Sequence, residues 1–219
     1  MKIFIPIKEN SQRVHRKNFR PFGPNQIPLY QYVIKKLDKF SIYVDTDSDE
    51  IISALSKSGA FDHVHAYRRS PDLLGDSVSV CDLVKYFITK NNIKDDFFCQ
   101  LHVTSPFIDS ELIETAMSKK SYGYDSIVSC NKIQSRLWRE EQYGYCPINH
   151  NPSKLEETQR LPVVYEENSI FYIINREQFL KSGNRIGVDP FFYPVGFPQN
   201  IDIDTEDDWQ IACQVGDIS

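Results

Sequence analysis

The chain has 219 residues, of which 41% are hydrophobic and 25% are charged, and its formal net charge is −5. This length and composition suit one folded domain with a substantial core, and they exclude an intrinsically disordered chain. The acidic balance argues against general binding to nucleic acid, which requires a basic face.

No stretch of the sequence is long and apolar enough to span a membrane, and the apolar start at residues 3–7 is too short for a signal peptide. The five cysteines are scattered and odd in number and show no C-x-x-C spacing, a pattern typical of reduced thiols and unlike a zinc site. We therefore expect a cytoplasmic protein with neither a membrane nor a nucleic-acid partner.

Short apolar runs alternate with amphipathic stretches along the first part of the chain. The expected strands are residues 2–7, 41–46, 63–67, 97–103 and 125–130. The expected helices are residues 29–37, a helix through residues 51–55 that Asp47 or Ser48 caps, residues 77–90 and residues 109–119. This alternation predicts an α/β fold with a mostly parallel twisted sheet flanked by helices. Such sheets bind ligands beyond the carboxyl ends of their strands, where the loops starting at Lys8, Asp45 and Thr104 are expected to lie.

Residues 131–167 interrupt this alternation, because they are rich in polar and turn residues and lack helical periodicity. A segment of this length without strong structure is usually a functional loop, a lid or a dimer arm. After it we expect a strand at residues 169–174, a short helix at 177–181 and a final helix around Trp209. The prediction is one domain over residues 1–219, with residues 131–167 as a dimer or lid excursion.

A basic loop of sequence KENSQRVHRKN follows the first expected strand, at residues 8–18. Cations and small polar groups suit a triphosphate, which requires neutralisation of its charge and hydrogen-bond donors. The loop has neither G-x-x-x-x-G-K-[ST] nor G-x-G-x-x-G, so it is not a Walker A loop or a dinucleotide fingerprint. Taken alone, a solvated basic loop explains these residues equally well.

Two aspartates, Asp202 and Asp204, lie two positions apart near the end of the chain. On an extended segment both carboxylates face one side, while the isoleucines that alternate with them face the core. Two carboxylates on one face suit Mg²⁺, which completes its shell with water and substrate phosphates. The alternative is the start of a helix, with Thr205 or Asp204 as N-cap and acids in the first turn. That alternative explains the acids at residues 206–208 but not the alternation before them.

Thr104, Ser105 and Pro106 follow the buried strand expected at residues 97–103. They lie at a strand end where ligands bind, and both hydroxyl groups could meet a substrate. A simple turn with a capping serine explains them equally well.

These segments together resemble the acylneuraminate cytidylyltransferases, the family of the CMP-sialic acid synthetases, from Lys2 to about Cys213. The basic loop is similar to the family's phosphate-binding loop, whose R-K-N ending falls on residues 16–18. Residues 201–208 are similar to the family's I-D-I-D-T-x-x-D segment, whose aspartates bind the metal.

Further motifs occur in the family's order. Residues 45–48 resemble its S-T-D-S turn, and residues 69–76 resemble its R-P-x-x-L-A-x-D segment near the nucleotide. Residues 102–106 lie where the family has Q-P-T-S-P. Residues 159–162 and 167–172 resemble the segments beside the sugar. The order and spacing of these motifs, more than any one of them, make the resemblance specific.

The resemblance implies a nucleotide-diphospho-sugar transferase-like fold and a homodimer that transfers CMP from CTP to a small acidic sugar, a nonulosonic or octulosonic acid, with release of pyrophosphate. It implies Mg²⁺ as cofactor, with Asp202 and Asp204 as ligands. The implied catalytic residues are Lys17, Arg16, Asp202 and Asp204. The implied nucleotide-binding residues are Lys8, Asn10, Ser11, Lys17, Asn18, Arg69 and Asp76. The implied substrate-binding residues are His102, Thr104, Ser105, Gln159, Glu166, Asn168 and Phe192. Packing in the core or at a dimer interface explains Phe192 equally well.

Several residues depart from the family pattern. The basic loop has Arg13 and His15 where the family commonly has Gly and Pro, and His102 replaces a Gln. Glu166 lies where sialic acid enzymes can carry an Arg near the sugar's carboxylate, and a carboxylate there argues against sialic acid itself. The alternatives are another acceptor, such as a phosphonate or a sugar phosphate, and a catalytically weak nucleotide-binding homologue.

Overall fold

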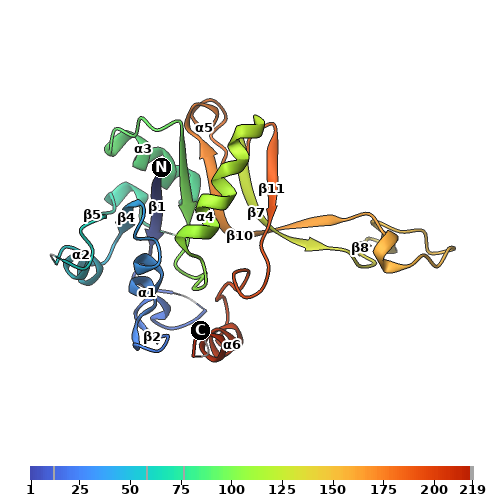
Figure 1. The fold of residues 1–219 in the computed structure, drawn as a ribbon, viewed down its shortest axis with the longest axis horizontal. Coiled ribbons are helices and arrows are strands. Elements are labelled where there is room, and N and C mark those ends of the chain that lie inside the picture. Colours follow the sequence, from blue (N-terminus) through green and yellow to red (C-terminus); the bar gives the residue numbers. More distant parts are fainter. Residues whose placement is uncertain (12, 58, 76, 218–219) are drawn as a thin grey trace.

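The computed structural model describes residues 1–11, 13–57, 59–75 and 77–217 (Figure 1). Its centre is a seven-stranded sheet in the order β11-β7-β10-β6-β1-β4-β5. The strands are β1 (Lys2–Ile7), β4 (Ser41–Thr46), β5 (Val64–Arg68), β6 (Phe97–Leu101), β7 (Ser126–Ile133), β10 (Val164–Asn175) and β11 (Pro190–Pro194). Within this sheet β10 runs antiparallel to β6 and β7, and the other neighbouring strands pair in parallel. The prediction of a mostly parallel sheet is confirmed.

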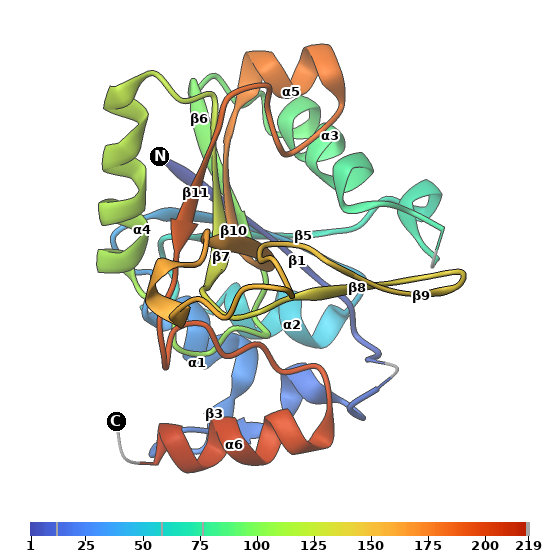
Figure 2. The ribbon, with the colours of Figure 1, turned by 90° about the vertical axis from the view of Figure 1, so that its right-hand side faces the viewer.

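Helices cover both faces of this sheet (Figures 1 and 2). They are α1 (Leu29–Lys35), α2 (Asp49–Leu55), α3 (Val80–Lys90), α4 (Ser110–Met117), α5 (Arg176–Ser182) and α6 (Glu206–Gly216). Alternate residues of β1 enter two separate cores, because successive side chains of a strand point to opposite faces. Ile3 and Ile5 pack with residues of α1, α2 and α4, whereas Phe4 packs with α3 and α5. The ring of Phe4 stacks on Phe87 of α3, with 4.7 Å between centroids.

The helix expected at residues 77–90 begins three residues later, and its cap explains the difference. Ser79 and Asp82 form a reciprocal capping box, in which each side chain accepts a hydrogen bond from the other's backbone N–H. The cap fixes the first helical residue at Val80, after which the buried residues recur at helical spacing.

Two strands differ from the sequence expectation. β10 begins at Val164, five residues before the expected start, and its register with β7 shifts between Glu167 and Tyr172. The strand β11 was not predicted, because prolines begin and end it and its pairing with β7 is set far away in sequence. Prolines are tolerated there because β11 lies at the edge of the sheet. Phe192 of β11 stacks on Tyr165 with 6.1 Å between centroids, so the structure shows packing at this residue.

A long arm leaves the sheet between β7 and β10 (Figure 1). It contains the antiparallel pair β8 (Trp138–Glu141) and β9 (Gly144–Pro147), which projects beyond the sheet. The sequence predicted an excursion at residues 131–167 but no strands in it, because β8 and β9 are polar and largely exposed. We call residues 134–163 the arm.

The remaining elements are short. They are β2 (Pro21–Phe22), β3 (Ile27–Pro28), and the 3-10 helices η1 (Lys17–Phe19), η2 (Pro71–Leu73), η3 (Ser118–Tyr122) and η4 (Thr158–Arg160). Among the described residues, no helix has both the length and the apolar character needed to cross a membrane. All five cysteines are free thiols.

Candidate active site

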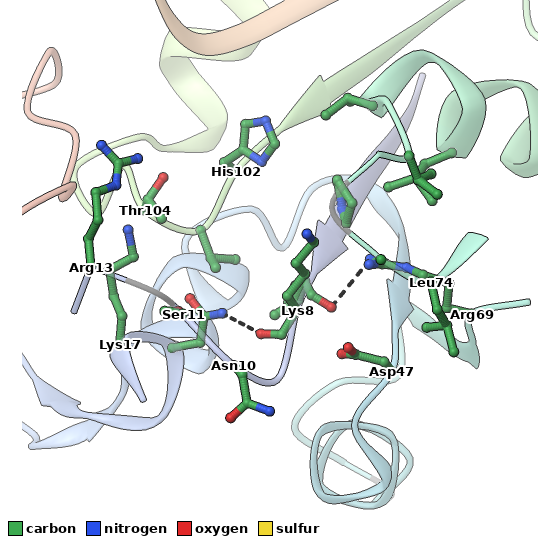
Figure 3. A pocket seen from close by; sticks show the side chains of 18 of the residues that line it. Lys8, Asn10, Ser11, Arg13, Lys17, Asp47, Arg69, Leu74, His102 and Thr104 are labelled. Atoms are coloured by element: carbon green, nitrogen blue, oxygen red, sulfur yellow. Dashed lines mark hydrogen bonds between the residues drawn. The ribbon is translucent and has the colours of Figure 1, made fainter. Parts of the chain in front are cut away.

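A cavity of about 610 Å³ opens at the carboxyl ends of β1, β4 and β6 (Figure 3). The basic loop lines it with seven described residues, Lys8, Asn10, Ser11, Arg13, Val14, Lys17 and Asn18. The segment after β5 adds a second wall through Arg69, Leu74 and Val78. The residues that follow β6 form a third wall, which consists of His102, Val103 and Thr104. The sheet topology therefore brings together loops that are up to about a hundred residues apart in sequence.

The basic loop keeps its shape without glycine. Val14 is 1% exposed and anchors the loop in the core, and Asn18 donates from Nδ2 to the carbonyl of Lys8 at 2.9 Å. Arg16 has a φ of 46°, in the left-handed region where glycine is usual. The described parts of the loop, residues 8–11 and 13–18, thus present side-chain cations to the cavity.

Lys17 joins this loop to the end of the chain. Its side chain is 10% exposed, and its Nζ donates a hydrogen bond to the carbonyl of Ile203 and lies 3.9 Å from Asp204 Oδ1. Arg13 Nη2 pairs with the same oxygen at 2.7 Å. Burial lowers the pKa of Lys17, and the charges of Asp202 and Asp204 oppose that shift. The basic loop and the aspartate pair therefore form one site.

Asp202 is held by the hydroxyl groups that follow β6. It accepts a hydrogen bond from Ser105 Oγ at 3.2 Å and another from the side chain of Thr104. Burial raises the pKa of Asp202; the Thr104 bond lowers it, and the neighbouring charge of Asp204 raises it. A backbone hydrogen bond joins the same two segments, since the N–H of Ile203 donates to the carbonyl of Thr104 at 2.9 Å.

The two sequence interpretations of this acidic segment apply to different residues. Thr205 is the N-cap of α6 and forms a capping box with Asp208. Asp202 and Asp204 precede the helix, and Ile203 between them is fully buried. Helix-start chemistry thus explains the later acids and not the aspartate pair, which contacts the cavity residues Arg13, Lys17 and Thr104 but does not itself line the cavity.

Arg69 serves as a cross-link beneath the cavity. Its Nε forms an ion pair with Asp45, and the two side chains are 2% and 0% exposed. Its Nη2 also donates to the carbonyls of Asp45 at 3.1 Å and Ile7 at 3.4 Å. Burial raises the pKa of Asp45, and the hydrogen bond from Arg69 opposes that shift. Arg69 therefore ties the ends of β1, β4 and β5 together at the cavity wall.

Arg16 and Asp76 stand apart from the other residues expected near the nucleotide. Arg16 is exposed, pairs with Glu50 of α2 at 3.0 Å and covers the ring of Phe19, so it does not line the cavity. The backbone of Arg16 is in the left-handed conformation, and its side chain points away from the cavity. We had expected this side chain to lie beside the phosphates. Asp76 lies outside the described residues, although its neighbour Gly75 lines the cavity.

The residues expected beside the sugar divide into two groups. His102 and Thr104 line the cavity and Ser105 is buried behind it. The others lie elsewhere and do not line it, namely Gln159, Glu166, Asn168 and Phe192. Gln159 is in η4 on the arm, whereas Glu166 and Asn168 of β10 both bond to Asn131. Their roles toward a sugar stay predictions, because none of the four lines this cavity. The arm that carries Gln159 projects beyond the sheet (Figure 1).

The sequence analysis missed three residues of the site. Arg13 pairs with Asp204, and Asp47 lines the cavity and accepts the backbone N–H of Glu9 at 2.7 Å. Gln100 is fully buried in β6 and contacts His102. An amide inside a strand expected to be buried on both faces is a signal that could have found Gln100.

Comparison with known proteins places this geometry among nucleotidyltransferases. A family model described as cytidylyltransferase matches residues 3–210. N-acylneuraminate cytidylyltransferase A of Danio rerio is 30% identical over 197 residues, which is 86% of this chain and 44% of that protein. N-acylneuraminate cytidylyltransferase of Streptococcus agalactiae serotype V is 27% identical over 176 residues, which is 78% of this chain and 41% of that protein. The chain thus spans less than half the length of these curated relatives.

Solved structures share the fold at low identity. CMP:2-keto-3-deoxy-manno-octonic acid synthetase in complex with CTP superposes with a TM-score of 0.64 at 15% identity, covering 97% of this chain and 96% of that one. A 4-diphosphocytidyl-2C-methyl-D-erythritol synthase superposes with a TM-score of 0.66 at 10% identity, covering 99% and 98% of the two chains.

Proposed function

This chain belongs to the cytidylyltransferase family, and we propose that it transfers CMP from CTP to an acidic sugar of the nonulosonic or octulosonic class with release of pyrophosphate. One observation carries the proposal: Lys17, which lines the cavity, donates a hydrogen bond to the backbone between Asp202 and Asp204, so the cationic wall of the cavity and the two carboxylates lie side by side. The relatives named for N-acylneuraminate and for 2-keto-3-deoxy-manno-octonic acid support an acidic sugar as acceptor.

The cations of the cavity suit the triphosphate of CTP. Lys8 and Lys17 line it beside the polar side chains of Asn10 and Ser11. Lysine ammonium groups neutralise phosphate charge as point charges, and small polar groups add hydrogen-bond donors. We assign the phosphates to this wall of the cavity.

We propose that Asp202 and Asp204 hold a single Mg²⁺. Among the described residues no group of three or more His, Cys, Asp or Glu side chains is arranged for a metal, and the donor set that we propose is these two carboxylates. That number suits Mg²⁺, which takes one or two carboxylates and keeps oxygens of water and phosphate. Arg13 and Lys17 lie against Asp204, so a bound Mg²⁺ would share this carboxylate with them or displace them. When bound, Mg²⁺ would neutralise charge on the phosphate oxygens.

The reaction is an in-line displacement in which the hydroxyl of the sugar attacks the α-phosphorus and pyrophosphate leaves. The chain contributes by positioning the reactants and by placing positive charge where negative charge develops. Lys17 is fixed for this purpose by its bond to Ile203 and by burial, so its charge needs no reorganisation during the reaction. Thr104 and Ser105 hold Asp202 in place.

The acceptor can be tested directly. We expect pyrophosphate release with CTP, Mg²⁺ and members of a panel of nonulosonic and octulosonic acids, and no more than background with phosphonates or sugar phosphates. A coupled pyrophosphate assay measures it, with ATP and UTP in place of CTP as controls. Release with a phosphonate or a sugar phosphate alone would refute the acidic-sugar proposal. Calorimetry that shows CTP binding without release from any acceptor would identify a weak nucleotide-binding homologue.

We also propose that the arm mediates a homodimer. Its large apolar side chains are exposed, with Tyr143 92%, Tyr145 71% and Leu155 90% exposed. Several large apolar side chains exposed on one segment favour an interaction site there. The five free cysteines support a cytoplasmic location for this protein.

The double variant Tyr143→Ser/Tyr145→Ser is expected to weaken the dimer by roughly tenfold to a hundredfold, since aromatic side chains dominate interface energies. Sedimentation velocity over a range of concentrations measures the dissociation constant. Tyr122→Ser is the matched control, because Tyr122 is 72% exposed but lies in η3, away from the arm. A monomeric wild type, or equal effects of both variants, would contradict an arm-mediated dimer.

A further inference from the structure

A buried polar chain runs from the surface of the molecule to the cavity wall. Gln100 of β6 is fully buried, and its Oε1 accepts a hydrogen bond from Arg185 Nη1 at 2.8 Å. Its Nε2 lies 3.0 Å from Nε2 of His102. Arg185 is held in place by the ring of Tyr172, whose centroid is 3.9 Å from the guanidinium carbon. The chain ends at His102, which lines the cavity (Figure 3).

Hydrogen-bond chemistry fixes the direction of every bond in this chain. A guanidinium group only donates, so the oxygen of the Gln100 amide must face Arg185. The amide nitrogen then faces His102, and an amide NH₂ only donates. Nε2 of His102 must therefore accept, which requires a neutral ring whose proton is on Nδ1.

We propose that Arg185 and Gln100 are positioning residues that hold His102 as the neutral Nδ1–H tautomer, so that the imidazole offers a hydrogen-bond donor to an oxygen of the ligand in the cavity. The ligand's identity, an acidic sugar with CTP, rests on the proposed function. The tautomer does not, because it follows from the contacts of the chain alone.

The charges around the ring agree with a neutral imidazole. Burial, together with the charges of Arg185 and Lys17, lowers the pKa of His102 to about 4, and the charge of Asp204 opposes this shift. At neutral pH the ring therefore carries no charge and can serve as a donor without adding a cation to the site. Gln at this position would offer a similar donor, the amide NH₂.

Nitrogen NMR of the full chain, with histidine labelled with ¹⁵N, tests the tautomer without ligand. The signals of His102 are assigned by their disappearance from the spectrum of the variant His102→Gln. At neutral pH we expect Nδ1 to give a protonated, pyrrole-type signal and Nε2 an unprotonated, pyridine-type signal. A protonated Nε2, or an imidazolium signal, would overturn the proposal.

Gln100→Glu should reverse the tautomer, because a carboxylate beside Arg185 can only accept from His102 and so requires a proton on Nε2. Gln210→Glu on α6 is the matched control, since Gln210 is exposed and distant in sequence. Arg185→Met frees the amide of Gln100 to turn and should give a mixture of both tautomers. An unchanged His102 spectrum in both Gln100→Glu and Arg185→Met would overturn the positioning role.

Steady-state kinetics then test whether the Nδ1–H group of His102 donates a hydrogen bond to the acceptor. In Gln100→Glu we expect the KM for the acceptor to rise roughly threefold to tenfold, the loss of about one hydrogen bond, with the KM for CTP changed by less than twofold. A reversed tautomer with an unchanged KM for the acceptor would overturn the assignment of the donor to that ligand. Failure of the wild type to turn over any acceptor would instead refute the proposed function, while the spectra would still decide the tautomer.

Discussion

Asp202→Asn is expected to lower turnover by at least about a hundredfold at saturating CTP, acceptor and Mg²⁺, a loss typical of removing one electrostatic contact to the transition state. Asn keeps the shape of Asp202 and an oxygen that can accept from Ser105 Oγ, which lies 3.2 Å from the carboxylate. It removes the negative charge that we assign to the metal. The initial rate of pyrophosphate release measures the effect.

Asp202→Asn should lower turnover but should not lower the unfolding temperature. This difference separates a catalytic defect from misfolding. Because burial raises the pKa of Asp202, its ionised form costs stability, and this cost grows as pH rises through the folded-state pKa. Asn carries no such cost, so the variant should unfold at the same or a higher temperature at neutral pH. The difference should vanish below about pH 4, where the unfolded carboxyl is also protonated.

Asp207→Asn is the control for Asp202→Asn. Asp207 is an exposed acid in the first turn of α6, and its loss should cost less than about 1 kcal/mol of helix-dipole stabilisation and leave turnover unchanged. Turnover of Asp202→Asn near the wild-type value under saturating Mg²⁺ would refute the assignment of the metal. A large drop accompanied by a lower unfolding temperature would indicate a structural role instead.

The features that local sequence could predict are those that depend on periodicity and on strand ends. Alternating strands and helices led to the parallel sheet, and the rule that ligands bind at the carboxyl ends of strands led to the loops at Lys8 and Thr104, which line the cavity. The spacing of Asp202 and Asp204 predicted that Ile203 between them would face the core, because side chains alternate along an extended segment. Ile203 is indeed fully buried.

The features that the sequence could not provide depend on partners far away in the chain. The partner of Arg69 is Asp45, which is 24 residues away, and no local pattern shows that this arginine is a cross-link as well as a part of the cavity wall. The edge strand β11 depends in the same way on its register with β7. Orientation is a further limit: the motif around Arg16 suggests a phosphate contact, but its backbone and Glu50 direct the side chain outward.

Arg69→Met is expected to destabilise the protein by about 3–5 kcal/mol, because it leaves the Asp45 carboxylate buried without a counter-charge. The side chains of the pair are 2% and 0% exposed, so solvent cannot replace the lost partner. The loss also removes the bonds from Arg69 to the carbonyls of Asp45 and Ile7 at the ends of β4 and β1. Urea unfolding monitored by circular dichroism measures it.

The pH dependence and a second substitution show whether the uncompensated charge is the cause. Burial already raises the pKa of Asp45 against the opposing hydrogen bond of Arg69, so the variant's carboxyl should bind its proton still more firmly. A raised folded-state pKa means stability that is present at low pH and lost as pH rises, so the deficit of Arg69→Met should be smaller at about pH 5 than at about pH 8. Adding Asp45→Asn should recover more than half of the loss.

The adjacent residue provides the matched control. Arg68 precedes Arg69 at the end of β5 and forms an ion pair with Asp49, but its side chain is 49% exposed. Exposed pairs contribute at most about 1 kcal/mol, so Arg68→Met should have a small effect. Equal losses in Arg68→Met and Arg69→Met would show that burial of the Asp45 pair is not what stabilises this end of the sheet. If the double variant were no more stable than Arg69→Met, the loss would come from the missing bonds to the strand ends and not from the charge of Asp45.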